Sequence, residues 1–268
     1  MDSMSAPQLT GEPPALMLAA AALSHPGRQR TENEDAFGSF VDGRLFVVAD
    51  GMGGHNAGEV ASAMAVDAIA SFFRAYHNQP QQAWPYPVDR SLSLAANLLR
   101  NGIKVANDQI RGAAAADRAR SRMGTTVVAM AIGEERLAVA HAGDSRAYRF
   151  RAGNVKRLTR DHSVAEEMRA ARPEMTDDEL ATFAHRNVVT RALGSKDDVE
   201  PAIYVGHVQP GDLFLLCTDG LWGSVPDGRI ATILRDAADL PTACQLLVDA
   251  ANDAGGPDNV TVLLVRAG

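Results

Sequence analysis

Short apolar runs without polar alternation are the feature that most constrains the fold of this chain. Bounded mainly by Gly and Asp, they occupy 45–49, 125–132, 137–140, 213–217 and 260–265. Their length and composition predict strands. Because neighbouring residues within each run are apolar, both faces of these strands should be covered by other layers rather than one face meeting water.

Two segments between these runs have the spacing of amphipathic helices. Apolar residues recur on one stripe over 59–73 and again over 92–110, so each segment should bury one face. Further helices are predicted over 229–237 and 242–254. Since the strands come in blocks rather than alternating strictly with helices, the order favours antiparallel sheets with helices outside over a doubly wound parallel sheet.

Length and composition indicate one large globular domain. The chain has 268 residues, of which 46% are hydrophobic and 22% charged, enough to build a substantial core. Residues 1–18, rich in Pro, Ser and Met, are predicted to form a loose N-terminal leader to a single domain over 19–268. Within that domain, 164–186 is charged and weakly patterned, and we expect a mobile helical insert beside the functional face.

Charge and cysteine content exclude several classes of protein. With 26 Lys and Arg against 33 Asp and Glu, the net charge of −7 lacks the cationic footprint of a nucleic-acid-binding protein. The apolar run 15–23 is shorter than the roughly 20 residues of a membrane-spanning helix. Cys217 and Cys244 have neither CxxC nor HExxH motifs around them to build a zinc site. We therefore expect a cytoplasmic protein that binds neither nucleic acid nor membrane.

Four aspartates stand at the ends of predicted strands: Asp50, Asp144, Asp219 and Asp258. Any one of them alone could cap a turn. If the strands lie side by side, however, the carboxylates converge and repel one another unless protons or cations intervene. Carboxylate, carbonyl and water oxygens are the ligands of Mg²⁺ or Mn²⁺, whereas zinc favours His and Cys.

Two further segments have both a functional and a structural interpretation. The glycines of 50–59 could bring the backbone close to a metal or phosphate, or could form only a tight turn between strand and helix. The segment 28–35 (RQRTENED) is either a solvated charged loop or a functional one. In the functional interpretation, Arg30 holds phosphate oxygens while Glu34 and Asp35 fix waters on a metal.

Several short blocks from about residue 23 to residue 265 carry a family resemblance. In chain order they are RTENEDAF, VVADGMGGHNAGEVAS, GTTVV, HAGDSRAY, LTRDHS, VVTRALG, CTDGLW and GPDNVTV. Together, in this order, they resemble the metal-dependent serine/threonine protein phosphatases of type 2C in their compact bacterial form. The resemblance implies an α+β fold, a four-layer α/β/β/α sandwich of two antiparallel sheets flanked by helices.

The resemblance also implies a ligand for each of the expected Mn²⁺ or Mg²⁺ ions. Asp50 would bridge two ions, and Gly51 would offer its carbonyl oxygen to one of them. Asp219 and Asp258 would hold the other ion. Asp144 matches the position that helps to bind a third ion.

Three residues of the first block match positions that act on the phosphate or on metal-held water. Arg30 matches the phosphate-binding arginine. Asp35 would act through water, and Glu34 either through water or as a direct ligand. The implied reaction is hydrolysis of a phosphoserine or phosphothreonine ester by a hydroxide that bridges the two ions.

Partners are likewise implied by the family rather than by the residues. They are phosphorylated proteins, including a serine/threonine kinase of the eukaryotic-like type and its substrates, and a monomer is the default state. A catalytically silent phosphatase-like domain that binds a phosphoprotein is the alternative, which loss of a metal carboxylate would favour. An enzyme acting on small phosphate esters is a second alternative.

Two positions depart from the family pattern. Met52 stands where the eukaryotic branch has a histidine, and a thioether cannot transfer a proton. The donor to the leaving alkoxide is then a metal-bound water, which we favour, or one of the histidines His55, His162 and His185. Gly223 replaces an aspartate that some members carry, which leaves one outer metal ligand open.

Overall fold

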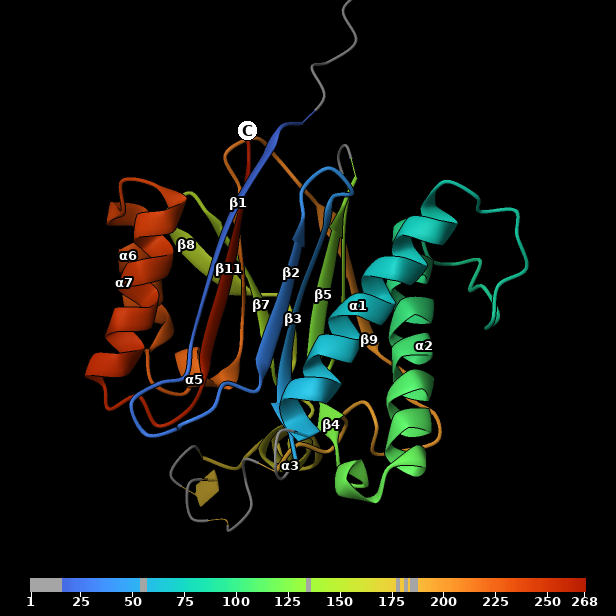
Figure 1. The fold of residues 1–268 in the computed structure, drawn as a ribbon. Helices are drawn as coiled ribbons and strands as arrows, with labels where there is room; N and C mark the ends of the chain where they lie inside the picture. The colour runs from blue at the N-terminus through green and yellow to red at the C-terminus, as the bar shows by residue number, and fades with distance from the viewer. Residues whose placement is uncertain (1–15, 54–56, 134–135, 177–178, 181–182, 184–187) are drawn as a thin grey trace, which may run out of the picture.

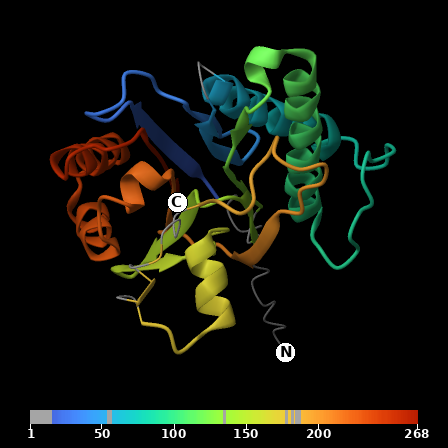
Figure 2. The ribbon, with the colours of Figure 1, turned by 90° about the horizontal axis from the view of Figure 1, so that it is seen from below.

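Two antiparallel β-sheets form the middle of the molecule, and helices cover their outer sides (Figure 1). The computed structural model describes residues 16–53, 57–133, 136–176, 179–180, 183 and 188–268. Seen from below, α1 and α2 lie on the opposite side of the molecule from α6 and α7 (Figure 2). The expected α/β/β/α layering is thereby confirmed.

The first sheet has the strand order β2-β3-β5-β6-β9, with the short β4 paired to β3. Its strands are β2 (Asp35–Phe40), β3 (Leu45–Met52), β4 (Gly124–Thr125), β5 (Val127–Ile132), β6 (Arg136–Ala142) and β9 (Ala202–His207). Helices α1 (Ala57–His77) and α2 (Leu94–Ala116) cover its outer face. Alternate residues of β3 serve two cores: Leu45 and Val47 pack with these helices, whereas Phe46 and Val48 pack between the sheets.

The second sheet has the order β1-β11-β10-β7-β8. Its strands are β1 (Leu18–His25), β7 (Arg146–Arg151), β8 (Asn154–Arg157), β10 (Leu213–Cys217) and β11 (Val260–Ala267). Helices α6 (Asp227–Asp236) and α7 (Leu240–Asp253) lie outside it. Leu215 faces the core beneath these helices, whereas Phe214 and Leu216 enter the core between the sheets. The consecutive apolar residues are thus buried on both faces, as their pattern predicts.

Strand register brings acidic residues to one end of both sheets. Asp35 pairs with Asp50 across β2 and β3. In the second sheet, Cys217 pairs with Arg146 and with Val262, so the residues just outside these three strand ends lie together. That end also carries β4, α3 (Val164–Ala171) and the one-turn helix α5 (Asp219–Trp222) (Figure 1).

The structure extends or corrects several sequence expectations. The run 125–132 is divided at Thr126 into β4 and β5, and β2 begins within the segment that we considered as a charged loop. The insert expected over 164–186 begins with α3, but 177–178, 181–182 and 184–187 lie outside the described residues. Residues 1–15 of the expected leader also lie outside them, and the single domain over 19–268 stays a prediction.

Two observations bear on the expected class of protein. Within the described ranges, none of the helices combines the length and hydrophobicity needed to cross a bilayer. Cys217 and Cys244 are buried free thiols.

Candidate metal and phosphate site

A cavity of about 440 Å³ opens at the end of the sheets where the acidic residues meet. The expected site residues in its wall are Arg30, Glu34, Asp50, Gly51, Asp144, Asp219 and Asp258. Met52 and Asn259 also line it. The structure therefore unites residues that lie more than 200 positions apart in the sequence.

Threonines of the β4–β5 segment fix the backbone of Asp50. Thr125 Oγ1 and the Thr126 amide donate hydrogen bonds of 2.8 Å and 2.9 Å to the Asp50 carbonyl oxygen. The Asp50 amide in turn donates to Thr126 Oγ1 at 3.2 Å. These bonds hold the end of β3 rigidly and leave the Asp50 carboxylate to the cavity.

Gly51 lies where only a glycine fits. A Cβ atom on Gly51 would lie 2.2 Å from the carbonyl oxygen of Gly58, at the start of α1. Its amide donates to the Glu34 carbonyl oxygen at 3.1 Å, and the Gly58 amide donates to Glu34 Oε1 at 3.2 Å. The close approach of β3, the 28–35 loop and α1 therefore sets the position of Glu34.

Asp35 lies behind Asp50 rather than in the cavity wall. Thr218 Oγ1 donates to Asp35 Oδ2 at 2.9 Å. Thr218 Oγ1 also accepts a hydrogen bond from the Thr261 amide at 2.9 Å. The water-mediated role that the resemblance implies for Asp35 stays a prediction.

Asn259 is an organising residue to which our sequence reasoning gave no role. Its Oδ1 accepts a 2.8 Å hydrogen bond from the Glu34 amide. Its Nδ2 donates to the carbonyl oxygens of Pro26 at 3.0 Å and Glu32 at 2.8 Å. One amide thus anchors the loop that carries Arg30. The only sequence signal is its place in the GPDNVTV block, because its partners lie at the other end of the chain.

Arg30 pairs with one of the expected metal ligands. Its Nη2 lies 2.9 Å from Asp258 Oδ2, and the two side chains are 55% and 38% exposed. Ion pairs this exposed contribute little to stability. The guanidinium can therefore exchange this carboxylate for a phosphate at small cost.

Burial is the main cause of a raised pKa at four of the acidic side chains. Burial raises the pKa of Asp35 and of Asp144 to about 7 and that of Asp219 to about 6. Burial, followed by the neighbouring carboxylates, raises the pKa of Asp50 well above its usual range. Converging buried carboxylates favour the protonated form, and the nearby Arg30 and Arg146 offset this only in part.

The donor set fits hard divalent cations that keep part of their water. Buried Asp35 Oδ1 and Asp219 Oδ1 have no hydrogen-bond partner among the described residues. Within those residues, no group of three or more Asp, Glu, His or Cys side chains encloses an ion by itself. Magnesium-like ions need no such cage, because they use one or two carboxylates and retain several waters. A carbonyl oxygen at Gly51 adds a ligand of the same kind.

Histidines contribute little to the acid–base chemistry of the described cavity. His162 Nδ1 accepts from the Gly143 amide at 3.1 Å, and its ring stacks on His141 with centroids 4.7 Å apart. Burial and the adjacent His141 lower the pKa of His162 to about 3, so its imidazole is neutral at pH 7. His55 and His185 lie outside the described residues.

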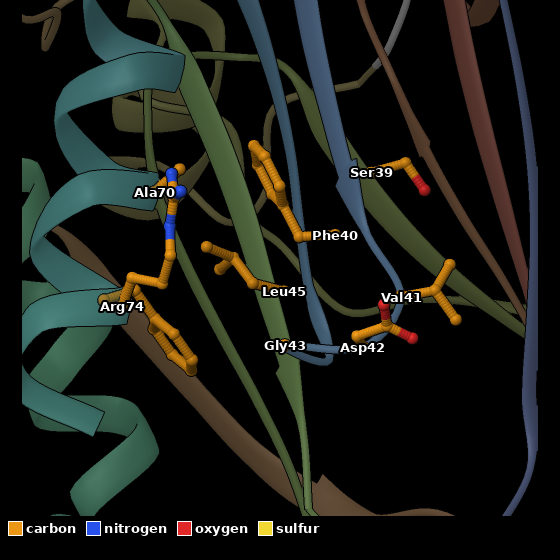
Figure 3. Close-up of a pocket in the computed structure, with 9 residues that line it drawn as sticks. Ser39, Phe40, Val41, Asp42, Gly43, Leu45, Ala70 and Arg74 are labelled. Atoms are coloured by element: carbon orange, nitrogen blue, oxygen red, sulfur yellow. The ribbon is translucent and has the colours of Figure 1, made fainter. Parts of the chain in front are cut away.

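A larger cavity lies elsewhere, at the opposite end of β2 and β3. It measures about 630 Å³ and is bounded by the β2–β3 turn and α1 (Figure 3). Phe40, Leu45 and Phe73 make it largely apolar, and Asp42 is the carboxylate in its wall. This cavity is larger but lacks a cluster of carboxylates. The smaller acidic cavity has the side chains that suit metal and phosphate.

Comparison with known proteins identifies the family of this chain. Residues 24–253 match the model of the family described as protein phosphatase 2C. The serine/threonine phosphatase Stp of Listeria welshimeri is 35% identical over 246 residues, which cover 90% of this chain and 92% of the relative.

Solved structures of bacterial phosphatases are similar to this chain over nearly its whole length. The crystal structure of the Mycobacterium tuberculosis serine/threonine phosphatase PstP matches with a TM-score of 0.81 and 31% identity, over 94% of this chain and 99% of that one. A second structure, the PstP catalytic domain in complex with two manganese ions, matches at 0.79 and 31% identity, with coverage of 94% and 99%. These relatives are bacterial, and the chain belongs to the protein phosphatase 2C family, the metal-dependent serine/threonine phosphatases.

Proposed function

We propose that this phosphatase removes phosphate from phosphoserine and phosphothreonine in proteins, using the acidic cavity as its active site. The observation that carries the proposal is the convergence of Asp50, Asp219 and Asp258 with Arg30 in one cavity. A catalytically silent phosphatase-like domain is not favoured, because all three carboxylates are present.

The ligand roles are those that the family resemblance implies. Asp50 would bridge two Mn²⁺ or Mg²⁺ ions, assisted by the Gly51 carbonyl oxygen, and Asp219 and Asp258 would hold one of the pair. Asp144 would help to bind a third ion. When bound, such ions lower the pKa of water and offset the charge of the phosphate.

Arg30 binds the phosphate of the substrate. Its planar guanidinium leaves Asp258 and makes paired hydrogen bonds to phosphoryl oxygens, and this charge supports the developing transition state. Glu34 and Asp35 hold and orient water beside the ligands. The Glu34 position is fixed by Gly51 and Gly58, and that of Asp35 by Thr218.

Water protonates the leaving alkoxide in this proposal. Met52 lines the cavity but cannot donate a proton, and His162 uses its Nδ1 to accept from Gly143. A histidine whose pKa is about 3 holds no extra proton to give at neutral pH. We expect kcat to stay within a few-fold of wild type in His162→Gln if the fold is retained.

The biological partners follow from the relatives. Bacterial serine/threonine phosphatases are the homologues of this chain, so we propose that it reverses a eukaryotic-like serine/threonine kinase, acting on that kinase and its substrates. Its buried free thiols agree with a cytoplasmic protein. We further propose that it acts as a monomer.

The proposal is tested by phosphate release from a phosphothreonine peptide. We expect release with added Mn²⁺ or Mg²⁺ and none with EDTA. A small phosphorylated metabolite, assayed in parallel, should be a much poorer substrate by kcat/KM. Preference for the metabolite would overturn the substrate class, and release in EDTA would overturn the role of the metals.

A further inference from the structure

Trp222 contacts the backbone of Asp144, and Arg146 in turn contacts Trp222. Trp222 Nε1 donates a 3.0 Å hydrogen bond to the backbone carbonyl oxygen of Asp144. The Arg146 guanidinium carbon lies 3.6 Å from the centroid of the Trp222 ring, a close cation–π contact. Neither side chain belongs to the described wall of the cavity.

Arg146 is itself held rigidly. Its Nη2 lies 2.6 Å from Asp161 Oδ2 and its Nε lies 3.0 Å from Asp161 Oδ1, a bidentate pair. Its Nη1 donates to the Tyr148 hydroxyl at 3.0 Å. The Arg146 and Asp161 side chains are only 14% and 5% exposed. Because breaking a buried pair leaves an uncompensated charge, the guanidinium is a fixed platform for the indole ring.

The same indole belongs to the helix that presents Asp219. Helix α5 begins at Asp219 and ends at Trp222, so a single turn links the Asp219 carboxylate to the hydrogen bond on Asp144. On the other side of Asp144, the Gly143 amide is held by His162. The Asp144 peptide is therefore clamped at both ends, and its distance from Asp219 is set by Trp222.

We propose that Trp222 and Arg146 are positioning residues that fix Asp144 relative to Asp219 and thereby set the affinity of the third-ion site. This inference rests on the role of Asp144 in the proposed function. The Asp50 carbonyl oxygen is held by Thr125 and Thr126, and the Asp219 carbonyl oxygen accepts from the Gly223 amide at 2.7 Å, so loss of the clamp should weaken the third ion while sparing the other two.

Trp222→Phe is the first test, because it keeps a ring over Arg146 and removes only the indole N–H. The chain has two tryptophans, which supplies a matched control. Trp84 also donates its indole N–H to a backbone carbonyl, that of Pro80, but does so in the loop between α1 and α2. Trp84→Phe therefore removes an equivalent bond far from Asp144.

Mn²⁺ binding is measured by isothermal titration calorimetry on metal-free protein, with Asp144→Asn to identify the third site. We expect Trp222→Phe to weaken that site about three- to tenfold, the effect of one hydrogen bond. Trp84→Phe should match wild type. The tighter sites should be unchanged in both, and the Mn²⁺ concentration for half-maximal phosphate release should rise only in Trp222→Phe.

Arg146→Lys gives an independent test, because lysine keeps the charge but loses the bidentate fork. In the Trp84→Phe background, Trp222 is the only tryptophan, and Mn²⁺ quenching of its fluorescence should follow the third site. Arg146→Lys should shift that quenching to higher Mn²⁺.

The inference would be overturned if Trp222→Phe bound Mn²⁺ as wild type does. It would also be overturned if wild type and Asp144→Asn gave the same isotherm, because no binding site would then depend on Asp144. Wild-type protein that binds three ions but releases no phosphate would instead overturn the proposed function alone.

Discussion

Gly220 shows how closely single residues determine this site. A Cβ atom at Gly220 would lie 2.0 Å from the Asn259 carbonyl oxygen, and Gly220 directly follows Asp219. Any side chain there must push apart two segments that carry metal ligands. The constraint comes from backbone atoms, which cannot move aside as a flexible side chain can.

Gly220→Ala should therefore lower both stability and activity. We expect a loss of about 1–3 kcal/mol, as for an overpacked core, and a marked fall in phosphate release. Gly228→Ala in α6 is the control, because no atom lies within 4 Å of its added Cβ. In urea denaturation, Gly228→Ala should be as stable as wild type or slightly more stable. Equal stabilities for the two variants would contradict the packing at Gly220.

Asn259→Ala should destabilise the protein by about 2–4 kcal/mol, because three hydrogen bonds are lost and buried partners are left unsatisfied. The Arg30 loop should also become accessible to proteases. Asn154→Ala, which removes one hydrogen bond to Ala152 in an exposed turn, is the control. The account fails here if limited proteolysis and urea denaturation do not distinguish the variants.

The raised pKa of Asp35 predicts a pH dependence of stability in metal-free protein. Its pKa is about 7 in the folded state and 3.8 in the ordinary state. Between these values the folded state binds more protons than the unfolded one, so the Asp35 contribution to stability falls as pH rises through this window.

Asp35→Asn removes that titration and also the charge that raises the pKa of Asp50, so both effects favour the variant over wild type at high pH. In EDTA, the Tm of Asp35→Asn relative to wild type should therefore be higher at pH 8 than at pH 5. A difference that shrinks or stays constant across this range would contradict the burial of the Asp35 carboxyl.

Among elements, the strands with almost wholly buried residues were predictable and the partly exposed ones were not. The run 45–49 became β3, whereas β2, β7, β8 and β9 were missed as strands. Three of these four lie at sheet edges, and β7 lies between β10 and β8. Edge strands are buried on one side only and carry polar residues, so pairing with a neighbour rather than local sequence decides their structure. Alanine-rich β1 has little intrinsic strand preference, and its pairing with β11 supplies it.

The presence of the helices was predicted better than the residues at which they begin. Capping side chains set these boundaries. Ser93 Oγ accepts from the Ala96 amide, so α2 begins at Leu94 rather than at residue 92. Asp239 Oδ1 accepts from the Thr242 amide and starts α7 at Leu240 instead of residue 242.

The insert over 164–186 is expected to gate substrate access. Val188 and Val189, which follow it, line the cavity, and Val189 is bridged to Ser163 just before α3. Replacing the insert with a short Gly-Ser linker should lower kcat/KM for a phosphoprotein severalfold and affect a small aryl phosphate less. Unchanged turnover of the phosphoprotein would contradict a gating role.

At the scale of the whole molecule, the proposed active site forms only when the two sheets pack together. Asp50 comes from the first sheet, whereas Asp219 and Asp258 flank strands of the second. The core between them includes Phe46 and Phe214. Metal binding should therefore depend on this packing, since the carboxylates repel one another in the absence of a cation.

This convergence marks the limit of what the sequence could predict. Strand ends and their aspartates are visible locally, but their meeting depends on sheet order, which only the family resemblance supplied. The bonds from Asn259 to Glu34 and from Trp222 to Asp144 join distant segments and leave no local pattern. Register and packing create them, and neither is encoded in periodicity.

The central claim is that this acidic cluster binds the metals that drive phosphate release, and Asp219→Asn tests it most directly. Mn²⁺ binding by calorimetry and phosphate release from a phosphothreonine peptide are measured on the same sample. Asp227→Asn, at the exposed start of α6, is the control. We predict loss of a tight binding step and a fall in release on the order of 100-fold or more, with the control unchanged. Wild-type binding and release in Asp219→Asn would contradict the account.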